Sequence, residues 1–574
     1  MALPRSILDP VEPADRDLAV VAGTMPDGIT GEIVISGPHP STLGPPHAFY
    51  GAGLTYRLSL QAGTFGAAPG TYAWRHAWID SPSARLQHAR PELFQRTMLG
   101  VQSPFGIVNA ANTAPLPWGD RLFTTWDVGR PVEVDPERLN FLGEVGRADE
   151  WLQSPRLAGA ALPMVTSTAH PVIDPDRNCM WTVNTNAGAL EIVRFDGTGP
   201  LRRWPITDAV IPQTVHTITQ SRNWIIVGDC AFKVELDVLF GGERTLTTNT
   251  SEPIYLIRKD DLDRAAPGTP VPCRRYELAP EMNHYYAQWD DDDGVVVLFE
   301  HTENADIAMA ASAGDLDAWG RPIDPRLAGL YGFAMTPSKT SLHRFDPETG
   351  IRHDLAWVYE PDLLHTRQLS AFDWSSEGWQ RPVAYHSVYH GFRPEAVNER
   401  MLDLYRDRVD RSQIPTEEMP AVLASHAWDG LGVTASHTYS DLGDIPSSPI
   451  FVPDRAGHDG RSAHGGVDAG GAHGWVVVPV LSDAGFRVEI FDASDVGTGP
   501  RCVLAAPRHA VPFFLHSAWM PEAKSAPTLP RTRFAEDLEV LGTVERLPDD
   551  LAAVAVAVAR DLDEGVPMRT APVS

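Results

Sequence analysis

Residues 179–197 read CMWTVNTNAGALEIVRFDG and contain two runs of strand length, 179–185 and 189–195. Both runs are rich in β-branched, aromatic and other apolar residues, which fit a pleated and partly buried surface. The second run ends at Asp196-Gly197, a dipeptide typical of a tight turn. This stretch therefore predicts short β-strands separated by turns.

Similar runs recur along the chain, at 32–36, 54–60, 121–126, 224–227, 254–257, 295–299, 475–480 and 487–491. Helical periodicity is scarce, and the 50 prolines and 47 glycines of the 574 residues are spread along the chain, which indicates many turns. A closed ring of sheets protects the edges of many short strands. We therefore predict an all-β fold, a β-propeller, although without a strict repeat the pattern alone does not predict the number of blades.

Three segments depart from this pattern. Residues 315–330 and 394–409 are predicted to be insertions with some helical character that cap one face of the propeller. Residues 534–564 form a different tail, in which 549–560 is rich in alanine and valine and begins with acidic residues, as a helix prefers. We expect a propeller domain over 1–524 and a C-terminal extension over 525–574, partly helical and packed on or trailing the propeller.

The overall composition excludes several classes of function. The formal net charge of −28 repels phosphate backbones, so a nucleic-acid partner is not expected. Residues 1–17 lack the apolar run of a signal peptide, and the chain has no stretch of about 18 apolar residues that could cross a membrane. The four cysteines are far apart and form no C-x-x-C pair, which favours a reducing, cytoplasmic compartment.

Four of the 20 histidines have a sequence context that suggests a shared role. His170 lies in STAHPVID (167–174), His216 and His284 each precede an apolar strand-like run, and His516 lies in VPFFLHSAW (511–519). Innermost strands of different blades point their ends at one axis, so distant histidines placed there can converge. Taken singly, a histidine is more often structural: His170 could serve a turn before Pro171, and His516 could be a core residue.

The four contexts resemble the metal-histidine motifs of the carotenoid cleavage oxygenase family. Other parts of the chain are similar to family motifs in the same order, namely GEIVISGPHP (31–40), HAFYGAGL (47–54), ANT (111–113), PIFVP (449–453) and residues 496–519. The resemblance covers about residues 23–521. It marks the chain as a divergent member.

The resemblance implies a seven-bladed propeller with Fe(2+) on its axis, held by His170, His216, His284 and His516. Neutral imidazole suits this ion. His301 is an alternative third ligand, but we prefer His284 because a hairpin follows it, as in the family. Thr113 is expected to project toward an open coordination position.

The residues expected to hold the metal-bound rings differ from those of the family. Metal-bound histidines normally donate their second N–H to an outer partner, and the family uses three glutamates. By motif, these positions are occupied here by Asp127, Gln368 and Ser448. This pattern predicts weaker iron binding or an unusual substrate.

Aromatic side chains near the motifs suit a tunnel for a long apolar substrate, and we assign Phe49, Trp126, Tyr285 and Phe514 to it. The alternative is that they form the cores of the blades. Trp126 stands where stilbene-cleaving members have a lysine that engages a phenolic oxygen, which argues against a copy of that mechanism.

The function implied is a non-haem iron dioxygenase that uses O₂ to cleave a C=C double bond of a carotenoid- or apocarotenoid-like polyene into two carbonyl products. Three alternatives remain: an iron enzyme acting on a non-carotenoid alkene, such as a stilbene-like compound or specialised metabolite, an isomerase or hydrolase on the same scaffold, and a non-catalytic ligand-binding propeller. Residues 327–335 are either an apolar patch for peripheral membrane contact or a buried run.

Overall fold

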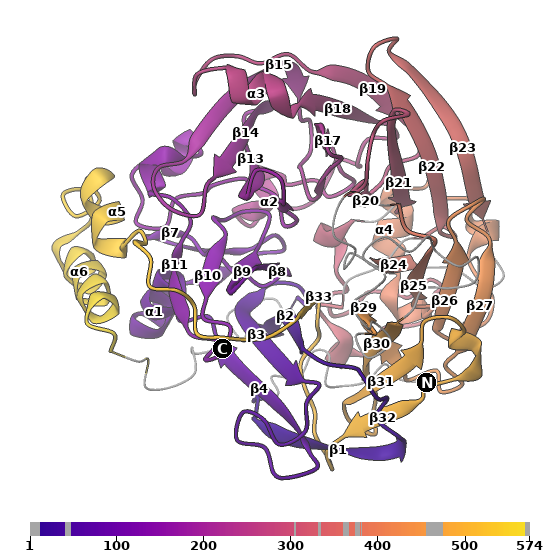
Figure 1. The fold of residues 1–574 in the computed structure, drawn as a ribbon. Helices are drawn as coiled ribbons and strands as arrows, with labels where there is room; N and C mark the ends of the chain where they lie inside the picture. The colour runs from indigo at the N-terminus through magenta and orange to yellow at the C-terminus, as the bar shows by residue number, and fades with distance from the viewer. Residues whose placement is uncertain are drawn as a thin grey trace.

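The computed structural model is a ring of antiparallel β-sheets around a central axis (Figure 1). The residues described are 12–40, 47–302, 306–330, 335–359, 367–372, 379, 381–454, 474–566 and 568. Within these residues the ring comprises five four-stranded sheets and one ten-stranded sheet, and a small three-stranded sheet lies outside it.

Each of the five four-stranded sheets is one blade built from consecutive strands, and the first strand of each blade lies innermost. The bounds are β8 (Ala114–Trp118), β9 (Arg121–Thr125), β10 (Val132–Val134) and β11 (Phe141–Glu144); β12 (Val172–Asp174), β13 (Cys179–Asn186), β14 (Ala189–Phe195) and β15 (Arg202–Val210); β16 (Ile218–Gln220), β17 (Trp224–Gly228), β18 (Glu252–Arg258) and β19 (Arg274–Leu278); β20 (His284–Tyr286), β21 (Val295–His301), β22 (Lys339–Asp346) and β23 (Ile351–Tyr359); and β24 (Arg367–Phe372), β25 (Ala384–Tyr389), β26 (Val422–Ala427) and β27 (Val433–Thr438).

The ten-stranded sheet contains the two blades that close the ring. One has β28 (Ile445–Pro446), β29 (Ile450–Pro453), β30 (Gly474–Leu481), β31 (Arg487–Asp492) and β32 (Cys502–Ala505); the other has β33 (His516–Met520), β2 (Glu32–Pro40), β3 (Gly51–Ser59) and β4 (Tyr72–Trp78). Strand β1 (Arg16–Gly23) pairs with β32 and with β4 and so joins the two blades. The described residues thus form the seven-bladed propeller that the resemblance implied, closed by strands from both ends of the chain.

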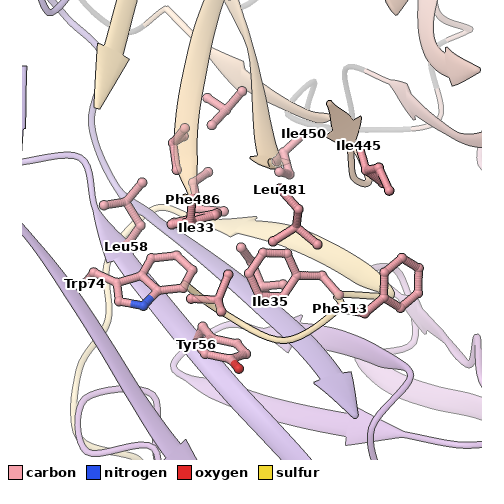
Figure 2. Close-up of a cluster of buried hydrophobic side chains, with 14 of the residues drawn as sticks. Ile33, Ile35, Tyr56, Leu58, Trp74, Ile445, Ile450, Leu481, Phe486 and Phe513 are labelled. Atoms are coloured by element: carbon pink, nitrogen blue, oxygen red, sulfur yellow. The ribbon is translucent and has the colours of Figure 1, made fainter. Parts of the chain in front are cut away.

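An apolar core fills the space between these two blades. Figure 2 shows Ile33, Tyr56 and Trp74 from β2, β3 and β4 facing Ile450 and Leu481 from the neighbouring blade. All five side chains are buried. This packing holds β33, and with it the first residue of that strand, in place beside the axis.

The strands predicted from short apolar runs are all present. The runs 179–185 and 189–195 become β13 and β14, which pair from Met180 with Phe195 to Asn186 with Ala189. The two residues between them, Ala187 and Gly188, have φ angles of 50° and 84°, as a two-residue hairpin turn of the favoured type requires.

The helices are short and lie between or outside the blades. Their bounds are α1 (Pro82–Ala89), α2 (Leu236–Leu239), α3 (Lys259–Arg264), α4 (Glu399–Leu404), α5 (Phe534–Val540) and α6 (Asp549–Asp563). The predicted helical character of 394–409 is confirmed by α4, whereas 315–330 contains one short 3₁₀ helix, Pro325–Leu327, and is otherwise irregular. The predicted helix over 549–560 is α6, with Asp549 and Asp550 in its first turn.

The small sheet of β5 (Gln95–Arg96), β6 (Val101–Ser103) and β7 (Gly106–Ile107) lies near α1 and the tail helices (Figure 1). Leu551, Ala555 and Val558 of α6 pack with Leu86 of α1 and Phe105 in one buried cluster. Their spacing of three and four residues explains why one face of α6 is covered.

Among the described residues, no helix is long and apolar enough to cross a membrane. Leu327, Leu330 and Met335 of the apolar run 327–335 are buried, so these three side chains do not form an exposed patch. Residues 331–334 of that run lie outside the described residues.

Candidate metal centre

Four histidines meet at the axis because each stands at the start of an innermost strand. His170 and His216 lie two residues before β12 and β16, and His284 and His516 are the first residues of β20 and β33. These strands belong to four different blades, with the innermost strand of each facing the axis. The ring of blades therefore brings together side chains that are far apart in the sequence.

One ligand nitrogen from each of the four rings lies within 4.8 Å of the others. The Nε2 atoms of His216 and His284 are 3.3 Å apart, and the ring centroids of His170 and His516 are 4.3 Å apart. Two metal–nitrogen bonds of about 2.1 Å at right angles place their nitrogens about 3 Å apart. The buried Nε2 of His170 has no hydrogen-bond partner, as a free ligand atom should. The cluster therefore fits a single metal ion.

Burial and neighbouring histidines keep two of the four imidazoles, those of His170 and His516, in the metal-binding form. Burial, reinforced by the other three histidines, holds the pKa of His170 well below its usual range. Burial and the neighbouring His216 do the same to the pKa of His516. Neutral imidazole offers a nitrogen lone pair to a metal, so these two rings need not lose a proton at neutral pH to bind one.

Asp127 holds the ring of His216. Its Oδ1 accepts a hydrogen bond from His216 Nδ1 at 2.8 Å, which leaves Nε2 directed toward the other rings. Asp127 lies in the segment between β9 and β10, and Ser167 is bonded to this segment through its N–H to the Asp127 carbonyl (2.8 Å) and its hydroxyl to Gly129 (2.6 Å). Ser167 lies three residues before His170. The segment between β9 and β10 therefore supports the chain near His170 as well as the ring of His216.

Glu300 is a carboxylate beside the cluster that sequence reasoning missed. It stands opposite His284 in the β20–β21 pair, and its Oε2 lies 3.6 Å from His284 Nδ1. The two side chains are 3% and 12% exposed. This hairpin is centred on Asp292, and residues equally distant from it pair with each other. The register of the hairpin therefore indicates Glu300 as the partner of His284. Glu300 is a carboxylate that the three motif positions, Asp127, Gln368 and Ser448, did not include.

The structure places His284, and not His301, with the other three rings. His301 ends β21, and both of its ring nitrogens are engaged, Nδ1 with the carbonyl of Pro280 (3.0 Å) and Nε2 with the hydroxyl of Ser341 (2.7 Å). It is therefore a core histidine of its blade.

The other residues singled out by motif occupy comparable places in the three remaining blades. Thr113 directly precedes β8, is 5% exposed, and donates a hydrogen bond from its hydroxyl to Asn112 Oδ1 at 3.2 Å. Ser448 lies two residues before β29 and is also 5% exposed. Gln368 lies in β24, but its side chain is outside the described residues. Their roles at the centre stay predictions.

Two of the four aromatic residues assigned to a tunnel belong instead to blade cores. Tyr285 is 1% exposed and its hydroxyl accepts the N–H of Gly228 at 2.6 Å. Phe514 is fully buried against Tyr56 and Trp74. Hydrophobic packing within the blades explains both residues without a substrate.

The other two are Trp126, which lies in the loop that carries Asp127, and Phe49, which is partly buried. Trp126 precedes Asp127 and contacts Tyr50 edge-on at 6.4 Å, while the partly buried Phe49 stacks on Phe513 at 5.6 Å. These positions agree with contact to an apolar ligand, which stays a prediction.

Phe232 is a neighbour of the cluster that carried no motif. Its ring lies 4.6 Å from that of His216, nearly perpendicular to it, and the residue is partly exposed. Its sequence signal was an aromatic residue shortly after strand β17. Its ring contacts one of the four imidazoles.

The segment that leads to His216 is held by a buried carboxyl group. Asp229 is fully buried, and its Oδ1 accepts the backbone N–H groups of Gln213 (2.8 Å) and Thr214 (3.1 Å). Burial raises the pKa of Asp229 to about 7, although these N–H groups lower it. The folded protein thus keeps a proton that the unfolded chain releases near the ordinary pKa of 3.8.

The free energy of unfolding is therefore expected to fall as the pH rises between about 4 and 7, by up to about 1.4 kcal/mol per pH unit from this group. Asp229→Asn removes the titration and should make the decline shallower. Urea unfolding of the metal-free protein at pH 5, 6 and 7 measures this. Asp237→Asn, at a carboxylate with 93% of its side chain exposed, is the matched control. An unchanged slope in Asp229→Asn contradicts the expectation.

Comparison with known proteins places this geometry in a family. The family model described as RPE65, Retinal pigment epithelial membrane protein, matches residues 8–521. A probable carotenoid cleavage dioxygenase 4 of Arabidopsis thaliana is 24% identical over 344 residues, 53% of this chain and 54% of the relative. Carotenoid cleavage dioxygenase 7 of Oryza sativa subsp. japonica is 30% identical over 153 residues, 22% of this chain and 25% of the relative. The chain thus spans about half or less of the length of these curated relatives.

Solved structures share the fold. A mutant of the Synechocystis apocarotenoid oxygenase has a TM-score of 0.61 at 16% identity, covering 90% of this chain and 98% of that one. A lignostilbene dioxygenase of Pseudomonas brassicacearum has a TM-score of 0.59 at 17% identity, covering 91% and 100%. A cobalt-substituted form of the Synechocystis protein scores 0.59 at 17% identity, covering 90% and 98%. Because the family model matches residues 8–521 of 574, this chain belongs to the RPE65 family of carotenoid cleavage oxygenases.

Proposed function

We propose that this protein is a non-haem Fe(2+) dioxygenase that cleaves a C=C double bond of a carotenoid- or apocarotenoid-like polyene into two carbonyl products. The observation that carries the proposal is the convergence of the His170, His216, His284 and His516 nitrogens within 4.8 Å. Membership of the family and the curated carotenoid cleavage dioxygenases among its relatives support the reaction class.

The four histidines would hold the iron as neutral nitrogen ligands, which suit this ion. Bound Fe(2+) supplies the reaction with O₂, in which one C=C bond and one O₂ molecule become two carbonyl groups. The chain itself orients the ligands: Asp127 fixes the His216 ring through Nδ1, and Glu300 lies beside Nδ1 of His284. Such outer partners fix the ring and raise the basicity of the ligand.

An apolar substrate is supported by what surrounds the cluster. The ring of Phe232 contacts that of His216, and Trp126 directly precedes Asp127 in the sequence. Trp126 also belongs to an apolar cluster with Tyr50 and Val128. Aromatic and aliphatic walls bind a long hydrocarbon chain and exclude water from the reacting double bond.

A non-carotenoid alkene is the second candidate, and a structural neighbour that is a lignostilbene dioxygenase supports testing it. Trp126, standing where stilbene-cleaving members have lysine, supports a polyene over a phenol-activated stilbene. The absence of glutamate from the three motif positions suggested a non-catalytic propeller. Asp127 and Glu300 nevertheless place carboxylates beside two of the four rings, which favours a metal centre.

Product analysis under ¹⁸O₂ tests the proposal. The iron-loaded protein is incubated with an apocarotenal and, separately, with a hydroxystilbene, and the aldehydes are reduced at once to prevent exchange with water. We expect two products from the apocarotenal, each carrying one ¹⁸O atom, and slower turnover of the stilbene. An isomer as product, or cleavage products without label, contradicts the proposal. Faster turnover of the stilbene than of the apocarotenal favours the second candidate, a non-carotenoid alkene substrate. Metal-free protein is the control.

A further inference from the structure

The loop that carries Asp127 is anchored from outside the propeller by the C-terminal tail. Residues 126–131 link β9 to β10, and Arg130 of this loop points its guanidinium toward β11 and α5. The side chain of Arg130 is 4% exposed. Its Nη1 donates to the carbonyl of Gly146 (2.7 Å), and its Nη2 donates to Glu144 and to Asp537.

Asp537 is the tail residue that makes this contact. It lies on α5 and is 4% exposed at its side chain. Its Oδ2 accepts from Arg130 Nη2 at 2.6 Å, and its Oδ1 accepts the backbone N–H of Ala148 at 2.8 Å. One oxygen therefore binds the β9–β10 loop and the other binds the segment that follows β11, across 407 and 389 positions of sequence. A buried, charge-assisted pair of this kind fixes geometry as well as adding stability.

The anchored loop leads directly to the candidate metal centre. The carbonyl of Arg130 accepts a hydrogen bond from Asn109 (2.9 Å), and Asn109 also donates to Glu144, so backbone and side chain of Arg130 are held in one network. Three residues earlier, Asp127 accepts from His216 Nδ1. A shift of Arg130 therefore acts on the position of the Asp127 carboxylate.

The tail also contacts the propeller at points other than Asp537. Arg531 forms a two-pronged ion pair with Glu133 (2.8 and 3.0 Å), Thr543 donates to the carbonyl of Gly159 (3.0 Å), and α6 packs on α1. In Figure 1, α5 and α6 lie at the rim of the ring beside α1 and β11. The family model ends at residue 521, so this anchor belongs to a part of the chain beyond the match.

We infer that the C-terminal segment 525–566 is a positioning element of the metal centre, in which Asp537 holds Arg130 and thereby sets the Asp127 carboxylate against His216. This inference rests on the proposed metal-dependent function. Asp537 and Arg130 are positioning residues, since the structure places neither in contact with the four histidines.

Cobalt(II) binding to the metal-free full chain tests the inference by isothermal titration. Asp537→Asn keeps the shape of the side chain but removes the ion pair, and we expect it to weaken cobalt binding about 10-fold, the lower end of what loss of an outer partner costs. In an Asp127→Asn background the same substitution should change the affinity less than about 2-fold, because residues that act through one another are not additive. Equal loss in both backgrounds overturns the inference.

Arg531→Gln is the matched control, since it removes another, partly buried tail ion pair while Glu133 keeps its pair with Arg121. We expect wild-type cobalt affinity from it; a loss as large as that of Asp537→Asn means that the tail acts only through general stability and overturns the role of Asp537.

Hydrogen exchange of the metal-free protein provides a readout that needs no metal. Asp537→Asn should speed amide exchange within 126–131, whereas Arg531→Gln should leave it unchanged. Unchanged exchange in Asp537→Asn overturns the inference even if the metal centre stands. A wild-type chain that binds no cobalt overturns the proposed metal centre itself. Amide exchange in 126–131 is measured without metal, so the two failures are distinguishable.

Discussion

Replacing His216 with alanine is expected to lower the affinity for cobalt(II) or iron(II) by more than about 100-fold, beyond the roughly 10–100-fold that loss of an outer partner costs. The reason is that one of four nitrogens within 4.8 Å is lost, and the carboxylate of Asp127 is left without its ring partner. Bound metal measured by elemental analysis after reconstitution, together with isothermal titration, checks this. Loss of both labelled products should accompany loss of the metal.

His301→Asn is the matched control for this experiment. His301 is a buried histidine of the same hairpin as His284, but both of its nitrogens are bonded within the blade. We expect it to reduce stability while the folded fraction keeps close to one metal ion per chain. If His301→Asn loses the metal and His216→Ala retains it, the assignment of the ligands is wrong.

Replacing Glu300 with glutamine is expected to weaken metal binding about 10–100-fold. The Glu300 carboxylate lies 3.6 Å from His284 Nδ1 with only 3% of its side chain exposed, so its charge acts on the ring with little screening by water. Removing the charge makes His284 a weaker ligand while Nε2 keeps its place. Titration of the metal-free protein with cobalt(II) measures the loss.

Two further variants separate charge from shape. Glu300→Asp keeps the negative charge and should bind cobalt more tightly than Glu300→Gln. Glu277→Gln removes a carboxylate with 48% side-chain exposure from β19 and should leave the affinity unchanged. Affinity in Glu300→Gln within 2-fold of wild type shows that Glu300 serves the packing of its blade and not the metal.

Asp127 and Glu300 both lie beside the cluster, but only Asp127 was identified by a sequence motif. Asp127 was found because it follows a tryptophan in a recognisable stretch, and the structure places it on His216. Glu300 lies in the apolar run of β21 and is brought beside His284 by the register of the hairpin. Register depends on the turn and on which face is buried, so a one-residue shift would direct Glu300 away from the ring.

The position of Tyr285 shows that nearness to a ligand in the sequence does not predict which face of a strand a residue occupies. Tyr285 stands next to the predicted ligand His284 in the sequence, yet successive residues of a strand point to opposite faces. Tyr285 follows His284 and so enters the blade core, where its hydroxyl bonds to Gly228. Proximity along a strand therefore predicted the wrong side for it.

The sequence by itself determined the all-β class and the places of the predicted strands, because alternating apolar residues and turn dipeptides are local properties. The set of four histidines was implied by the resemblance of their sequence contexts to family motifs. Only the tertiary structure decided that Glu300 lies beside the His284 ring and that Asp537 holds Arg130 from 407 positions away. Those contacts arise from strand register and from the closing of the ring, both of which depend on the packing of the whole chain.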